Sequence, residues 1–169
     1  MNYLLIGRPN VGKSSIYNIL TKSNANIIHK ESGTTRDWHK GKIFSTTDHY
    51  IYDTPGVMVD SDENNNIKSI NLLDRLLSKI DIFIFVIDYQ TNLNPFDEEG
   101  VRLLRKYNKK ILLIINKVDN LNNKKSYDHY KYGIDNVFLI SCAHKIGFDK
   151  LLKFLKSSLT IDSITEDSY

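Results

Sequence analysis

The sequence has little of what marks several common classes of protein. It contains one cysteine, Cys142, so an internal disulfide is excluded and a reducing compartment is favoured. Its apolar runs are too short to span a bilayer, and a net charge of +3 does not demand a nucleic-acid partner. None of the 5 histidines has the spacing of metal ligands. The 169 residues, 41% hydrophobic and 25% charged, suit one globular domain, and the cytoplasm is its expected location.

One stretch organises the interpretation of the whole chain. Residues Gly7–Ser14 read Gly-Arg-Pro-Asn-Val-Gly-Lys-Ser, which fits the pattern Gly-x4-Gly-Lys-Ser. The apolar run Tyr3–Ile6 precedes the stretch, and Ser15–Leu20, which has helical spacing, follows it. A strand, a glycine-rich loop and a helix in that order are typical of a P-loop, whose backbone N–H groups wrap phosphate oxygens. Because the loop begins so near Met1, no signal peptide is expected.

The P-loop predicts where phosphates and a metal would bind. Lys13 would reach the β- and γ-phosphates, and the Ser14 hydroxyl would hold Mg²⁺. The dipole of the following helix favours an anion at the same place. A glycine turn with a chance Lys-Ser is the alternative, and the strand–loop–helix context argues against it. The predicted phosphate-binding residues are Asn10, Val11, Gly12, Lys13, Ser14 and Ser15.

Apolar periodicity predicts an α/β fold. Ile82–Ile87 and Ile111–Ile115 are wholly apolar, as expected for parallel strands covered by helices on both faces. The predicted strands are Asn2–Ile6, Lys42–Thr46, His49–Asp53, Ile82–Asp88, Ile111–Asn116 and Val137–Ser141. The predicted helices are Lys13–Leu20, Ile67–Lys79, Asp97–Tyr107, Lys124–Tyr130 and Phe148–Leu159. We therefore expect a six-stranded, mostly parallel sheet with one antiparallel edge strand and about five helices, forming one domain over 1–160, with a linker start or disordered tail over 161–169.

The polar connections of this fold fall into two kinds. Lys42–Thr46 and His49–Asp53, separated by Thr47-Asp48, are predicted to form an antiparallel hairpin at the sheet edge. The stretches Ser23–Gly41 and Val57–Asn66 lack periodicity and are rich in polar residues. We expect both to be mobile loops that flank the phosphate site.

Two further motifs point to the metal and the γ-phosphate. Asp53–Gly56, with the sequence Asp-Thr-Pro-Gly, closes a predicted strand forty residues after Lys13. In that position the Asp53 carboxylate can hold Mg²⁺ through water and the Gly56 N–H can reach a γ-phosphate, although the same four residues elsewhere are a common structural turn. In the first polar loop, the hydroxyl of Thr34 or Thr35 can complete the Mg²⁺ coordination. Such a contact exists only in the triphosphate state, which makes the loop a switch.

The stretch Asn116–Asp119, Asn-Lys-Val-Asp, predicts a guanine site at the end of an apolar strand. The Asp119 carboxylate can accept from N1–H and the 2-amino group of guanine. Adenine lacks that amino group, so an unpaired carboxylate would penalise it by about 10⁴-fold. Asn116 would tie the base loop to the P-loop, and the Lys117 stem would lie along the base plane. A second turn follows the last strand, and its N–H groups would donate to guanine O6; it comprises Ser141, Cys142 and Ala143.

The order of these motifs resembles that of the translation-factor-related GTPases over about residues 3–159. More closely, Gly7–Ser14, Thr35–Asp37 and Asp53–Gly56 resemble the Era/Der (EngA)/MnmE group. Within that group the chain is most similar to the first G domain of the Der proteins, by Thr35–Asp37 taken together with Asp88 and Asp97. The resemblance implies a P-loop NTPase G domain that hydrolyses GTP slowly as a molecular switch in assembly of the large ribosomal subunit.

The resemblance also implies roles for single residues. It prefers Thr35 over Thr34 as the switch threonine, so that the implied Mg²⁺ ligands are Ser14, Thr35 and Asp53. Ras-like enzymes place a Gln after Asp-x-x-Gly, where this chain has Val57. Instead, the family implies a K⁺ ion beside the phosphates, with Asn10 as its protein ligand. The implied catalytic residues are Lys13, Thr35, Gly56 and Asn10.

The chain departs from the family in two ways, and other functions compete. Der proteins carry a second G domain and a C-terminal KH-like domain, so this chain is expected to be part of a longer protein. The family usually has Ala where Cys142 stands; we expect little effect, because backbone donors bind the base. A nucleotide-binding docking module with negligible hydrolysis is one alternative, favoured by Val57. The cytosolic G domain of a FeoB-type iron transporter, which shares Pro-Asn in the P-loop, is another. A P-loop kinase would have no use for Asn116–Asp119.

Overall fold

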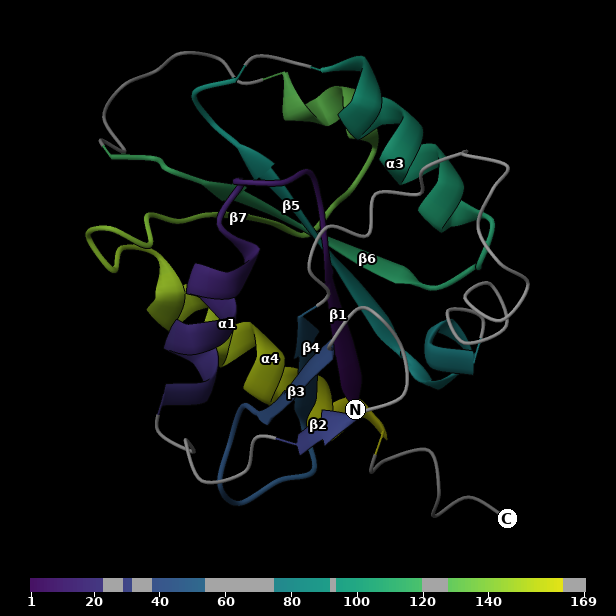
Figure 1. Cartoon of the computed structure of the whole chain (residues 1–169), viewed down its shortest axis with the longest axis vertical. Helices are drawn as coiled ribbons and strands as arrows, with labels where there is room; N and C mark the ends of the chain where they lie inside the picture. Colours follow the sequence, from purple (N-terminus) through teal and green to yellow (C-terminus); the bar gives the residue numbers. More distant parts are fainter. Residues whose placement is uncertain (23–28, 32–37, 54–74, 92–93, 120–127, 163–169) are drawn as a thin grey trace.

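The computed structural model describes residues 1–22, 29–31, 38–53, 75–91, 94–119 and 128–162, which form a twisted sheet with helices on both faces (Figure 1). The 7-stranded sheet has the order β2-β3-β4-β1-β5-β6-β7. Its strands are β1 (Asn2–Ile6), β2 (His29–Glu31), β3 (Trp38–Lys42), β4 (Tyr50–Asp53), β5 (Ile82–Asp88), β6 (Lys110–Asn116) and β7 (Val137–Leu139). From β4 to β7 every neighbouring pair is parallel, whereas β3 runs antiparallel to both of its neighbours, β2 and β4, at one edge. The predicted mostly parallel α/β sheet is confirmed, with a seventh strand, β2, beyond the six that were expected.

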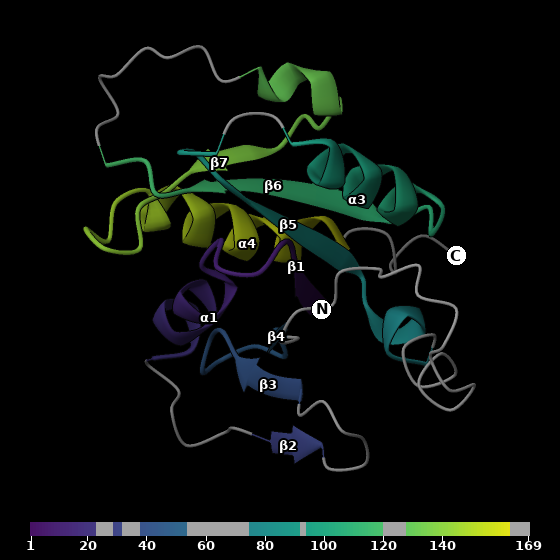
Figure 2. The ribbon, with the colours of Figure 1, turned by 45° about the horizontal axis from the view of Figure 1, so that its top comes forward.

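Helices cover both faces of this sheet. Helices α1 (Lys13–Thr21) and α4 (Phe148–Asp162) lie on one face, and α3 (Pro95–Arg105) lies on the other (Figure 2). Residues 75–79 are also helical, on the same face as α3, and a short 3-10 helix, η2, spans His129–Tyr132. Within the described ranges, none of the helices has the length and apolarity needed to cross a membrane.

The alternation of side chains along β5 explains the two helical layers. Ile82, Ile84 and Val86 pack into the cluster that includes residues of α1 and α4, whereas alternate β5 residues pack into the cluster that includes residues of α3. All seven positions of β5 are buried. Each such side chain contributes roughly 1.5–3 kcal/mol when it leaves water. Because both faces are covered, the carboxyl ends of the parallel strands are left to form a site.

The antiparallel pairing of the predicted hairpin is confirmed, but its first strand lies earlier in the chain than expected. We expected a strand at Lys42–Thr46. The structure instead has β3 at Trp38–Lys42, which shares only Lys42 with the prediction and pairs with β4. Residues 43–49 form the connection instead, closed by a bond from the Ile43 N–H to the His49 carbonyl. Ile43 is buried in the core and leaves the ladder to pack there. The stretch Ser23–Gly41, expected to be a loop, contains β2 and most of β3.

The helices keep their expected places with shifted ends. Helix α3 begins at Pro95, before the predicted Asp97, because the Asn94 side chain accepts from the Phe96 N–H at 3.0 Å and caps the helix. It ends at Arg105, and α4 continues to Asp162. The predicted helix Lys124–Tyr130 lies mostly outside the described residues, and its described end belongs to η2. Residues 163–169 of the tail also lie outside the described residues. So do residues 67–74 of the predicted helix Ile67–Lys79, whose remaining residues, 75–79, are helical.

Candidate functional site

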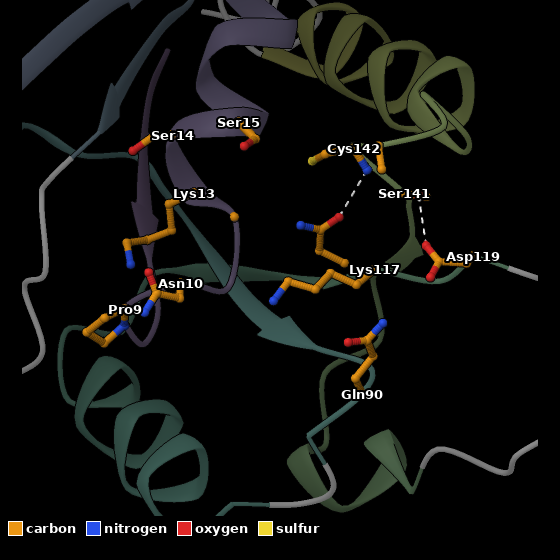
Figure 3. Close-up of a pocket in the computed structure, with 13 residues that line it drawn as sticks. Pro9, Asn10, Lys13, Ser14, Ser15, Gln90, Lys117, Asp119, Ser141 and Cys142 are labelled. Carbon is orange, nitrogen blue, oxygen red and sulfur yellow. Dashed lines mark hydrogen bonds between the residues drawn. The ribbon is translucent and has the colours of Figure 1, made fainter.

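A pocket of about 760 Å³ lies where the P-loop meets the carboxyl ends of β6 and β7 (Figure 3). Phosphate-loop residues lie at one end of it, and residues of the two predicted base-binding turns lie at the other. The residues that line it are Pro9, Asn10, Gly12, Lys13, Ser14, Ser15, Gln90, Asn116, Lys117, Asp119, Ser141, Cys142 and Ala143. Of the predicted phosphate-binding residues, only Val11 is missing from this lining, because it is buried in the core beneath the loop.

The P-loop owes its shape to close backbone approaches. Gly7 has φ 155°, and a Cβ on it would lie 2.3 Å from the Val86 carbonyl oxygen of β5. Gly12 has φ 103°, and a Cβ there would lie 2.2 Å from the Asn116 side-chain nitrogen. Asn10 takes a left-handed conformation with φ 64°. Only glycine fits the two close positions without displacing a neighbour.

Lys13 lies on the floor of the phosphate end. Its Nζ donates to the carbonyl oxygens of Gly7 at 2.7 Å and Arg8 at 2.8 Å, and the residue is only 7% exposed. Burial lowers the pKa of its ammonium group, and the nearby Asp53 carboxylate partly opposes that shift. A poorly hydrated cation fixed by two carbonyls gains strongly from an anion placed beside it.

Ser14 and Asp53 bring a hydroxyl and a carboxylate together below the phosphate end. The Ser14 Oγ donates to Asp53 Oδ2 at 2.8 Å. The other carboxylate oxygen, Oδ1, is buried and has no hydrogen-bond partner in the described part of the chain. Hydroxyl and carboxylate oxygens are the ligands that Mg²⁺ prefers, and an unsatisfied anionic oxygen is the group that a cation or its water would complete. These two residues therefore fit a magnesium site.

The other residues predicted for the metals and the γ-phosphate divide into two groups. Asn10 lines the phosphate end beside Lys13, with its side chain exposed, as Figure 3 shows. Thr35 and Gly56, and with them Thr34 and Val57, lie outside the described residues. Their proposed roles in binding and hydrolysis stay predictions.

Asn116 joins the two ends of the pocket. Its Nδ2 donates to the Val11 carbonyl at 2.9 Å, and its Oδ1 accepts from the Cys142 N–H at 3.2 Å. The residue is 2% exposed, at the last position of β6. One amide thus links the P-loop, the base loop and the last turn, because both its donor and its acceptor are used. These two protein contacts fix the spacing of the three segments.

Lys117 and Asp119 follow Asn116 on the base loop. Lys117 has φ 67°, and its Nζ donates to Asp88 Oδ2 at 2.5 Å, so its stem crosses the pocket wall. The Asp119 side chain keeps 53% of its surface exposed. It accepts from the Ser141 hydroxyl at 3.4 Å, and the His144 Nε2 lies 3.9 Å from its Oδ1. The carboxylate is therefore positioned by weak contacts and remains open to a ligand.

The turn Ser141–Ala143 closes the base end. Ser141 is fully buried and bridges to Ile146, so the turn has a fixed shape. Burial raises the pKa of the Cys142 thiol to about 11, partly opposed by a hydrogen bond with Asn116. The thiol is protonated at neutral pH, and the residue acts as a half-buried filler whose backbone N–H holds Asn116.

Two pocket residues escaped the sequence analysis, Pro9 and Gln90. Gln90 comes two residues after the end of β5 and lies below Lys117 in Figure 3. Its position at the carboxyl end of a parallel strand was a usable signal, because ligands bind at that edge of such sheets. Pro9 sits inside the recognised P-loop, but no chemistry of its side chain pointed to it.

Comparison with known proteins relates this geometry to a family. The sequence pattern of a family described as "50S ribosome-binding GTPase" matches residues 2–117. A protein called GTPase Der from Aquifex aeolicus is 33% identical over 159 residues, which cover 90% of this chain and 37% of that protein. The chain thus spans little more than a third of the length of this relative.

Solved structures agree in fold. A GDP-bound mutant of the S. thermophilus FeoB G domain has a TM-score of 0.67 and 26% identity, covering 90% of this chain and 58% of that one. Era in complex with MgGDPNP and a segment of 16S ribosomal RNA has a TM-score of 0.63 and 25% identity, covering 91% and 55%.

Proposed function

This chain belongs to the 50S ribosome-binding GTPase family, and on that premise we propose that it binds GTP and GDP and hydrolyses GTP to GDP and phosphate. One observation carries the proposal. Asn116 bonds both to the P-loop at Val11 and to the base-end turn at Cys142, so a phosphate cradle and a purine-edge site face one pocket. Its volume of about 760 Å³ is of the size that ligand sites have.

The residues divide the work of binding between the two ends. Asp119 accepts from the guanine N1–H and 2-amino group, the turn Ser141–Ala143 donates to O6, and Lys117 lies along the base. Lys13 meets the β- and γ-phosphates from the pocket floor. Ser14 and Asp53 would hold Mg²⁺, which would supply positive charge to the phosphate oxygens, and Thr35 and the Gly56 N–H would complete the triphosphate state.

Hydrolysis needs positive charge over the phosphates and an aligned water. With Val57 in place of a glutamine, we propose slow turnover that K⁺ stimulates, Asn10 being its ligand in the P-loop. The exposed position of Asn10 at the phosphate end supports this role. Lys13 keeps its place at the phosphate end through its two backbone carbonyl partners.

For the biological role we propose a switch that acts on the large ribosomal subunit in the cytoplasm. The family description and the relative called GTPase Der support that partner. The second candidate is the G domain of an iron transporter, favoured by the fold of the FeoB G domain at 26% identity. The higher identity of 33% over 90% of the chain favours the first. A docking module that does not hydrolyse GTP is the third.

Calorimetry and single-turnover kinetics test these proposals in sequence. GTP and GDP should bind in the presence of Mg²⁺, and ATP should bind about 10⁴-fold more weakly. Equal binding of ATP and GTP, or no binding of either, would contradict the proposed function.

Hydrolysis in KCl should exceed hydrolysis in NaCl of matched ionic strength. Equal non-zero rates would remove the K⁺ role, and no hydrolysis in either salt would favour the docking module. Co-sedimentation with isolated 50S subunits, with 30S subunits as the control, tests the ribosomal partner.

A further inference from the structure

Three side chains that belong to none of the nucleotide-binding motifs reach toward both ends of the pocket. They are Asp88 at the end of β5, Thr91 just after it and Asp97 in the first turn of α3. None of the three lines the pocket. We call these three residues the acidic brace, after the carboxylates of Asp88 and Asp97. Their contacts run to the P-loop on one side and to the base loop on the other.

At the phosphate end the brace holds Arg8. The Arg8 Nε donates to Asp97 Oδ1 at 2.8 Å and its Nη2 donates to Asp97 Oδ2 at 3.0 Å. Asp97 is 0% exposed, so its charge is tolerated only with such a two-pronged partner. Thr91 accepts from Arg8 Nη2 at 2.8 Å and donates to the Asp88 carbonyl at 3.3 Å.

This anchor reaches the phosphate site through the backbone. Arg8 is followed by Pro9 and Asn10, which line the pocket, and its own carbonyl oxygen accepts from the Lys13 Nζ at 2.8 Å. A guanidinium locked against α3 therefore fixes the carbonyl that orients Lys13. Asp97 therefore reaches the phosphate end indirectly: it contacts Arg8, and the Arg8 carbonyl oxygen contacts Lys13.

At the base end the brace holds Lys117. Asp88 Oδ2 accepts from its Nζ at 2.5 Å, and Asp88 Oδ1 accepts from the Gln90 N–H at 2.8 Å. Both oxygens of this buried carboxylate are thus engaged, one by the base loop and one by its own strand end. Lys117 and Gln90 line the pocket, so their places in it depend on Asp88.

We propose that the acidic brace is a positioning device, with Asp97 setting the P-loop and Asp88 setting the base loop. The inference rests on the proposed nucleotide function and adds residues to it. Buried ion pairs are weak evidence for stability, and their best-supported use is to specify one arrangement over others. The brace therefore acts on nucleotide affinity, and its two carboxylates act on different parts of the nucleotide.

A comparison of guanosine, which has no phosphate, with GDP separates the two ends of the pocket. Affinities are measured by competition against a fluorescent GDP. Asp97→Asn should weaken GDP by about tenfold and leave guanosine within about twofold, because only the phosphate end moves. Asp88→Asn should weaken guanosine and GDP by the same factor, about three- to tenfold, because the base end is common to both. Glu98→Gln removes one charge from the same turn of α3 on an exposed side chain and should change neither affinity.

A second variant covers the case in which Asp97→Asn does not fold. The double variant Arg8→Gln/Asp97→Asn leaves no unpaired buried charge and should show the same selective loss for GDP. If the unsubstituted chain binds GDP and the folded variants keep its affinity within about twofold, the brace is overturned while the proposed function stands. Equal losses for guanosine and GDP in the Asp97 variants would also overturn it. If the unsubstituted chain binds no guanine nucleotide, the proposed function itself fails.

Discussion

The two ends of the pocket are prepared to different degrees. At the purine end, Asn116 satisfies its donor and its acceptor within the protein, and Lys117 is already held by Asp88. At the phosphate end, Asp53 keeps one buried oxygen without a hydrogen-bond partner among the described residues. The Lys13 ammonium there is buried and donates to two carbonyl oxygens.

This difference indicates that the choice between bases is made at the purine end, whereas the response to the metal and the phosphates arises at the phosphate end. A purine end in which Asn116 and Lys117 are already held by the protein can discriminate between bases at a lower ordering cost. A phosphate end with an unsatisfied carboxylate and a dehydrated cation is completed only by a metal and phosphates. The comparison predicts that substitutions at the purine end change which nucleotide binds, whereas those at the phosphate end change how binding depends on Mg²⁺.

The strongest test of the purine end is Asp119→Asn. The amide no longer offers two acceptors to guanine, so GTP affinity should fall by at least about 100-fold. Xanthine nucleotides, which carry an oxygen in place of the 2-amino group, should gain affinity. Calorimetry with GTP and xanthosine triphosphate measures both effects. Asp135→Asn, an exposed carboxylate that does not line the pocket, is the control. Unchanged GTP affinity would show that the base site is misassigned.

Gly12→Ala tests whether the two ends depend on one another. The new Cβ would lie 2.2 Å from the Asn116 side-chain nitrogen, at a φ of 103° that strains any residue with a side chain. GDP affinity should fall by about tenfold or more, and the free energy of unfolding by about 1–3 kcal/mol.

The control for this clash is a double-mutant cycle with Asn116→Ala. Because the alanine removes the atom that clashes, Gly12→Ala should cost less affinity in that background than in the unsubstituted chain. Additive losses would mean that the two ends do not communicate through Asn116.

Asp53→Asn addresses the phosphate end. It removes the carboxylate charge from the predicted metal site, so the gain in GTP affinity on adding Mg²⁺ should shrink by about fivefold, with affinity in EDTA nearly unchanged. Without ligand the variant should be no less stable, because a buried unpartnered anionic oxygen is replaced. Titrations with and without Mg²⁺, together with thermal unfolding of the free protein, check both statements. Ser14→Ala should show the same loss of Mg²⁺ dependence.

The smallest expected effect belongs to Cys142. Cys142→Ala should leave GDP affinity within about twofold, because the backbone N–H that holds Asn116 is retained. With its pKa raised to about 11, the thiol should react slowly with iodoacetamide at pH 7 and faster as pH rises toward 11, since only the thiolate attacks. Rapid alkylation at neutral pH would contradict the buried, protonated thiol.

Sequence patterns predicted the interior of the sheet far better than its edge. The bounds of β1 and β5 match their predictions, because continuous apolar runs identify strands covered on both faces. The edge strands β2 and β3 carry polar residues and Gly41, which have no strand periodicity, so tertiary pairing alone defines them. Helix α3 begins two residues before its predicted start because Asn94 caps it, and apolar periodicity does not report a cap.

The candidate site divides in the same way. Motif residues such as Lys13, Asn116 and Asp119 were found because their spacing along the chain is tied to strand ends, and the structure brings them to one pocket. In the sequence, the partners Asp88 and Asp97 stand out only as part of the likeness to the Der proteins. Their contacts join residues 29 and 89 positions apart, a relation that no local pattern contains.

The central position of β5 affects which parts of the molecule open locally. It pairs with β1 on one side and with β6 on the other, and every one of its residues is buried. Its amide protons should therefore be among the last to exchange with deuterated solvent, at a rate set by unfolding of the whole domain. The P-loop and the base loop extend from its two neighbours, so a nucleotide can enter and leave through local opening while this central strand stays protected.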